Sequence, residues 1–92
     1  MSNPVVVGDW SHFDFTLTPQ AKDAFETAMQ PLFEAKYTPL AFASRVAGGL
    51  DYCFLCDVQY PTPFPDGNAV KVYLYQPSDG RPYLYRIVPI SP

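Results

Sequence analysis

The sequence has few basic residues and few of the side chains that build metal or redox centres. Its 92 residues include six Lys and Arg, scattered singly, with one His and two Cys, and the formal net charge is −3. Binding the phosphates of a nucleic acid requires clustered cations, so we expect no nucleic-acid partner. With a single histidine and no second cysteine pair, we also expect no metal and no other cofactor.

The sequence also has no long apolar run. None of its apolar stretches approaches the roughly 20 residues needed to cross a bilayer, so we expect no membrane partner. The N-terminal stretch "MSNPVVVGDW" has no positively charged residue before its three valines. We therefore expect no export signal, and a cytoplasmic location unless a leader has been removed.

Apolar and aromatic side chains are plentiful. They make up 48% and 16% of the chain, with seven Phe and seven Tyr. This composition is typical of a globular domain, and the length suffices for one domain but not for two. We expect a single domain over residues 1–92, with residues 1–12 forming a partly flexible N-terminal trunk.

A helix is predicted over residues 18 to 36. Thr18 can cap the first turn, and Pro19 is suited to the first helical position because its missing N–H would have no partner there. The following apolar residues recur at spacings of three and four, as on one face of a helix: Ala21, Ala24, Phe25, Ala28, Met29, Leu32 and Phe33. Pro31 lies inside this pattern and should kink the helix.

After Tyr37 the apolar period changes to two, which predicts strands. Turn residues at Gly48-Gly49, at Asp66-Gly67 and from Pro77 to Gly80 divide the pattern. The predicted strands cover residues 39–46, 51–60, 69–76 and 82–88. One helix followed by hairpin-connected strands predicts an α+β fold, with a kinked helix packed across a twisted antiparallel sheet of four to five strands.

The stretch "CFLC" has a Cys-x-x-Cys spacing that could indicate redox chemistry or a metal. On a strand, however, residues three apart point to opposite faces and lie about 10 Å apart. A disulfide needs Cα atoms within about 7 Å. We therefore expect Cys56 to be a small core residue and Cys53 to lie on the other face of the sheet, without acting as a pair.

Three stretches carry a resemblance to a known family. They are "VGDWS" from Val7 to Ser11, "YTPLAFASRV" from Tyr37 to Val46, and "RVAGGLDYCFLC" from Arg45 to Cys56. The last resembles the Gln-x-Val-x-Gly loop and following strand of the cystatin family of cysteine-protease inhibitors, and the first is similar to the Gly-Gly-Trp-Ser of many members. The helix and four strands follow in the family's order, over about residues 7 to 88.

The resemblance implies a cystatin-like fold and a wedge that plugs the cleft of a papain-like cysteine protease. The wedge would have three parts: a trunk of Val5, Val6 and Val7 before Gly8; a first loop of Arg45, Val46, Ala47, Gly48 and Gly49; and a second loop from Pro77 through Ser78 to Gly80. The loop differs from the family motif at two positions, because Arg45 replaces the glutamine and Ala47 replaces the valine.

Two other functional classes are alternatives to the inhibitor. An enzyme would need converging titratable groups, but Asp51 and Asp57 are six residues apart on a strand, about 20 Å, and cannot act as a carboxylate pair. His12 and Asp14 could share a face, but such surface pairs are usually only solvated. We therefore expect no enzymatic activity.

The stronger alternative is a cystatin-like protein-binding module without inhibitory activity. Tyr73 and Tyr75 are predicted to point away from the helix, and the stretch "PYLYRI" adds either Tyr83 and Tyr85 or Leu84 to that side. Clustered exposed tyrosines are typical of partner surfaces, and they also stabilise sheets. The sheet edges and the hairpin at Gly48-Gly49 leave open a monomer or a domain-swapped dimer.

Overall fold

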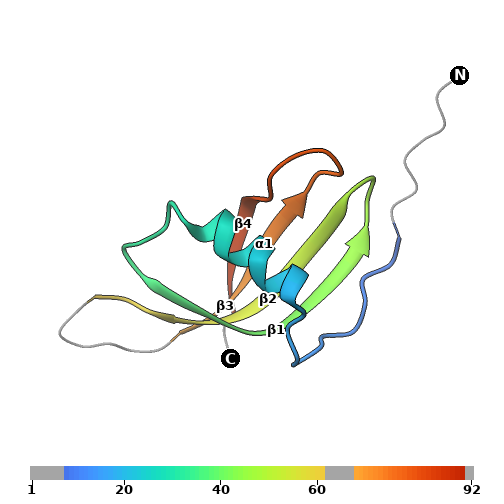
Figure 1. The fold of residues 1–92 in the computed structure, drawn as a ribbon. Coiled ribbons are helices and arrows are strands. Elements are labelled where there is room, and N and C mark those ends of the chain that lie inside the picture. The colour runs from blue at the N-terminus through green and yellow to red at the C-terminus, as the bar shows by residue number, and fades with distance from the viewer. Residues whose placement is uncertain (1–7, 62–67, 91–92) are drawn as a thin grey trace, which may run out of the picture.

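The computed structural model describes residues 8–61 and 68–90, and in these residues one helix packs on one four-stranded antiparallel sheet (Figure 1). The elements are α1 (Pro19–Met29), β1 (Lys36–Val46), β2 (Leu50–Gln59), β3 (Asn68–Gln76) and β4 (Tyr83–Ile90). The strands lie in the order β1-β2-β3-β4, so each pairs with its neighbours in sequence. The expected α+β fold is confirmed. In the described ranges, α1 falls short of the length and apolar character that a membrane span requires.

Helix α1 begins as the sequence predicts. The Thr18 hydroxyl accepts a hydrogen bond from the Ala21 N–H at 3.1 Å, and Pro19 occupies the first helical position. Its buried face carries three alanines, whose small side chains let the helix axis approach the sheet, together with Phe25 and Met29. The ring centre of Phe25 lies 4.9 Å from that of Phe54 on β2, and this contact packs the helix against the sheet.

The end of the helix differs from the expectation. The helix ends at Met29 rather than near residue 36, so the break expected at Pro31 marks the end of the helix. Proline has no N–H to continue the ladder and clashes with the preceding turn. Leu32 and Phe33, which continue the apolar spacing, are 37% and 86% exposed and do not join the core.

Strand β2 is the centre of the sheet, and its two faces are as predicted. Tyr52, Phe54, Cys56 and Val58 face α1 and belong to the buried core, while Cys53 lies on the opposite face. Three residues of β3 join this core from the neighbouring strand: Val70, Val72 and Leu74. Because the even residues of both strands face the helix, the odd residues form a second surface, here called the helix-free face.

Strand boundaries differ from the prediction mainly at β1 and β4. Strand β1 begins at Lys36 instead of residue 39, and β4 runs on to Ile90 instead of ending at residue 88. Pro89 fits because β4 is an edge strand, where a missing N–H removes no ladder hydrogen bond. The turn predicted at Asp66-Gly67 lies outside the described residues.

Candidate binding site at one end of the sheet

Three segments that are far apart in the sequence meet at one end of the sheet (Figure 1). They are the start of the described chain at Gly8, the loop between β1 and β2, and the loop between β3 and β4. The Gly8 N–H donates to the Val46 carbonyl at 2.8 Å, which places it beside the first loop. Leu50 pairs with Gln76, which places the first loop beside the second.

The first loop is a three-residue hairpin turn. Val46 and Leu50 form the last pair of the β1–β2 ladder, so the turn consists of Ala47, Gly48 and Gly49. Gly48 has a φ of 79°, which side chains rarely permit. Gly49 has no room for a side chain, because a Cβ there would overlap the backbone oxygen of Gln76. The two glycines therefore serve different purposes, the first for backbone conformation and the second for close approach to the second loop.

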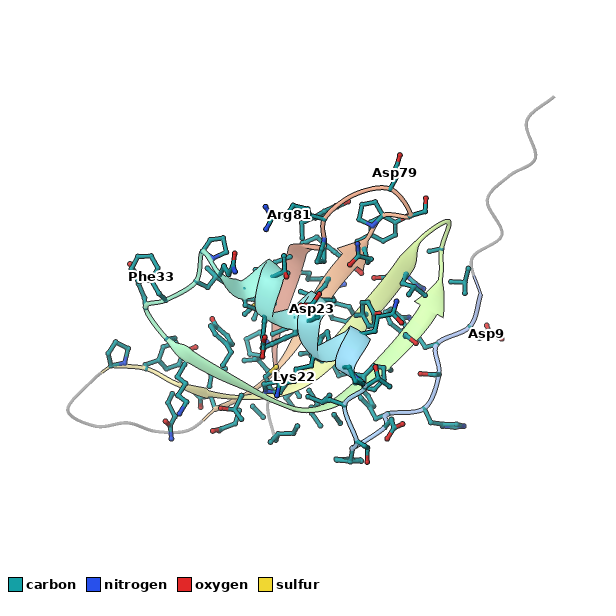
Figure 2. All side chains as sticks on the ribbon, in the orientation of Figure 1. Asp9, Lys22, Asp23, Phe33, Asp79 and Arg81 are labelled. Carbon is teal, nitrogen blue, oxygen red and sulfur yellow. The ribbon has the colours of Figure 1, made fainter. Side chains whose placement is uncertain are left out.

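The second loop spans residues 77–82 and is held by the side chain of the residue before it, at the end of β3. The Gln76 amide Nε2 donates to the carbonyl oxygen of Gly80. Pro77 is half-buried, whereas Ser78 and Asp79 are exposed. Asp79 projects from the tip of this loop in Figure 2.

The segment from Gly8 to Asp14 runs antiparallel along the outer edge of β1. Besides Gly8, the Ser11 N–H donates to the Ser44 carbonyl at 2.9 Å, and Asp14 and Phe42 exchange two backbone hydrogen bonds. This segment is the nearest feature to a fifth strand, although it forms only an isolated bridge. The predicted trunk residues Val5, Val6 and Val7 lie outside the described residues.

A network of charged and aromatic side chains ties these parts together on the helix-free face. The Arg45 Nε donates to Asp51 Oδ2 at 2.9 Å, and the Tyr85 hydroxyl donates to Asp51 Oδ1 at 2.6 Å. The Arg45 guanidinium also lies over the Trp10 ring, 4.5 Å from its centre. One buried carboxylate thus joins β1, β2, β4 and the N-terminal segment.

The first-loop residues divide into two groups. Arg45 is turned onto the sheet and engaged by Asp51 and Trp10. Val46 is 61% exposed, and Gly48 is also exposed. The free surface of the loop is therefore concentrated at Val46 and Gly48, while Ala47 and Gly49 are half-buried.

Sequence reasoning missed the Asp51 network, although a signal for it exists. Arg45 and Asp51 are equidistant from Gly48, and the hairpin register makes them direct cross-strand partners. Opposite charges at such positions attract. The distant contributions of Trp10 and Tyr85 have no comparable local signal.

The helix-free face carries a cluster of aromatic rings. Tyr73 lies 6.0 Å from both Trp10 and Tyr85 between ring centres, and Tyr75 lies 5.9 Å from Tyr83. A register shift in the β3–β4 pairing, between Tyr73 and Leu74, accompanies this arrangement. Leu84 packs against the core on the other side. Of the two alternatives that the sequence left open, the structure therefore selects Tyr83 and Tyr85.

The candidate catalytic groups do not converge. His12 and Asp14 are exposed, and an Asp14 carboxylate oxygen accepts the Thr16 N–H at 2.9 Å. Asp57 pairs with Ala69, far along β2 from Asp51. In the described parts of the chain, no three His, Cys, Asp or Glu side chains gather where they could hold a metal ion.

Cys53 and Cys56 are both free and buried. Burial raises the pKa of Cys56 from its ordinary value of 9.0 to about 12, and it raises the pKa of Cys53 as well. The thiolate is the reactive form, so we expect both thiols to react slowly with Ellman's reagent at pH 8 and rapidly once urea unfolds the chain. Fast reaction of the native protein would contradict this placement.

The same shift gives stability a pH dependence. Below pH 9 the thiol of Cys56 is neutral in both the folded and the unfolded protein. Between pH 9 and about 12 only the unfolded chain releases its proton, so the free energy of unfolding should fall across this window. Urea midpoints measured at pH 8 and pH 10 check the sign, and a Cys56→Ala variant should show a smaller fall.

A hollow of about 570 Å³ lies at the opposite end of the sheet from the three segments and is lined mainly by apolar residues. Among them are Leu32, Phe33, Tyr37 and Tyr60. Burial raises the pKa of Tyr37. Among the described lining residues, apolar side chains predominate, and Glu34 is the one carboxylate.

Searches against protein-family models, curated proteins and solved structures found no match for this chain.

Proposed function

We propose that this protein inhibits papain-like cysteine proteases by inserting the sheet end formed by Gly8, the first loop and the second loop into the active-site cleft. The observation that carries the proposal is the convergence of these three segments. The Gly8 N–H donates to the Val46 carbonyl, and Gly49 is in close contact with the backbone of Gln76, so the three segments lie side by side. The two loops are those that the cystatin resemblance assigns to the wedge, and Gly8 directly follows the trunk that it assigns.

The shape and chemistry of this end suit occlusion of a cleft. The loop tip exposes an apolar side chain at Val46 and a glycine at Gly48, with the small Ala47 half-buried between them, so the backbone can approach an enzyme surface closely. Apolar side chains fill hydrophobic subsites. Because Arg45 is engaged by Asp51, its charge does not stand at the tip and does not oppose this contact.

Replacing Val46 with aspartate should weaken inhibition by about tenfold or more, because it places an unpaired carboxylate at the tip of the wedge. The measurement is residual papain and cathepsin activity on a fluorogenic peptide, titrated with the protein in reducing buffer. Gly49 is a poor site for this test, because any side chain there disrupts the loop as well as the contact.

Phe33→Asp is the matched control. Phe33 is 86% exposed and lies at the opposite end of the molecule (Figure 2). This variant makes the same change of charge and should inhibit as the unmodified protein does. Equal inhibition by both variants, or no inhibition at micromolar protein, would overturn the proposal.

In that event a binding module acting through the aromatic cluster of the helix-free face becomes the better hypothesis. Tyr83 and Tyr85 are 52% and 47% exposed, and such rings are enriched in protein interfaces. Light scattering after size-exclusion chromatography then separates self-association from binding to another protein.

A further inference from the structure

A second, shallow hollow of about 390 Å³ opens on the helix-free face beside the first loop. It is lined by Ala47, Asp51, Tyr75, Tyr83 and Tyr85. Three tyrosines therefore surround a carboxylate whose residue is only 5% exposed. The first loop contributes one wall, but no residue of the loop tip beyond Ala47 takes part.

The hollow offers hydrogen-bond acceptors and few donors. The Tyr75 hydroxyl donates its proton to the Ala47 carbonyl at 3.0 Å, and the Tyr85 hydroxyl donates its proton to Asp51. A phenol that has donated its proton keeps lone pairs that accept. The oxygens of Tyr75 and Tyr85 are therefore available as acceptors, and their rings present negative π faces.

The charge distribution points the same way. Arg45 binds Asp51 through Oδ2 and lies over Trp10, and it is not among the residues that line the hollow. The hollow thus faces the negative side of this ion pair. Burial raises the pKa of Tyr85, and the hydrogen bond and charge of Asp51 raise it further. The contribution of Asp51 disfavours a second negative charge beside it.

We infer that this hollow binds a primary alkylammonium group, such as the side chain of a lysine on a partner protein. An ammonium is compact and carries three donors and no acceptor, which complements a site of acceptors, and a cation is attracted to the faces of tyrosine rings. The inference is independent of protease inhibition, since it rests on the side chains of β2, β3 and β4.

The test uses the whole chain labelled with ¹⁵N and titrated with n-butylammonium chloride at constant ionic strength. Saturable shifts are expected at the backbone amides of Tyr75, Tyr83 and Tyr85. The same titration with the N-acetyl, N-methylamide derivative of lysine distinguishes a small amine from a lysine in a polypeptide. A site for protein lysines binds this derivative more tightly, and a site for free amines binds it less tightly.

Tyr83→Ala is the informative variant, because Tyr83 is half-exposed and no hydrogen bond of the described structure uses its hydroxyl. Removing its ring should weaken butylammonium binding about three- to fivefold. Tyr60→Ala is the matched control, since Tyr60 is 43% exposed and lines the hollow at the far end. That variant should bind as the unmodified protein does.

Two further probes test the role of charge. Butyrate and n-butanol have a similar length without the cation, and neither should produce saturable shifts at these amides. Binding of either probe as tight as that of butylammonium would overturn the inference. The same holds if Tyr83→Ala leaves the affinity unchanged or if the shifts map elsewhere.

Discussion

Replacing Phe54 with alanine is expected to lower the free energy of unfolding by about 3–5 kcal/mol. Phe54 is fully buried at the centre of β2. The centre of its ring lies 4.9 Å from the ring centre of Phe25 of α1 and 5.7 Å from that of Tyr52. The loss includes the transfer energy of the ring and the cavity left between helix and sheet. The total free energy of unfolding of a domain of this size is only about 5–15 kcal/mol, so the variant should be close to unfolding at 37 °C.

Urea denaturation at 25 °C measures this loss, and Phe33→Ala provides the comparison. Phe33 is the same residue type but 86% exposed, so its replacement should change the free energy of unfolding by no more than about 0.5 kcal/mol. Similar losses for the two variants would mean that the core does not lie between α1 and β2. That outcome would also remove the basis for the arrangement of the loops.

Replacing Gly49 with alanine should lower the free energy of unfolding by about 1–3 kcal/mol and separate the two loops. The added Cβ would overlap the Gln76 backbone oxygen, and it would lie 3.1 Å from the Pro77 Cα and 3.0 Å from the Tyr75 hydroxyl. Backbone cannot move aside as a flexible side chain can. The variant should therefore lose stability and, if the proposed function holds, inhibitory activity as well.

Gly80→Ala is the control within the same pair of loops. A Cβ at Gly80 would meet only the Pro77 ring at 3.4 Å, an ordinary contact. We expect the free energy of unfolding, measured by urea denaturation, to change by no more than about 0.5 kcal/mol. If Gly49→Ala is equally harmless, the loops are not in contact, and the convergence that supports the wedge is lost.

The regular parts of the fold could be predicted because each depends on neighbours in the sequence. The helix start follows from Thr18 and Pro19, and the faces of β2 follow from its strict alternation. The helix end could not be predicted from the same periodicity, because Leu32 and Phe33 keep the apolar spacing without reaching the core. At this point the backbone chemistry of Pro31 outweighs the pattern.

The candidate sites were less predictable because they depend on distant contacts. The first loop could be identified from its two glycines, but that Arg45 turns to Asp51 and Trp10 depends on where the N-terminal segment lies. Alternation puts Tyr83 and Tyr85 on one face, but which face of the sheet that is depends on the pairing of β4 with β3. Neither feature has a local sequence signature.

The strand order β1-β2-β3-β4 also has a kinetic consequence. Since each strand pairs with the next one along the chain, the sheet can form by successive closure of hairpins, each starting at its loop. The segment from Gly8 to Asp14 instead pairs with β1 across about 30 residues, through contacts such as Gly8 to Val46 and Asp14 to Phe42. We expect this segment to dock last in folding and to detach first in native-state hydrogen exchange, so the end of the sheet that carries the proposed wedge is the last part of the molecule to be completed.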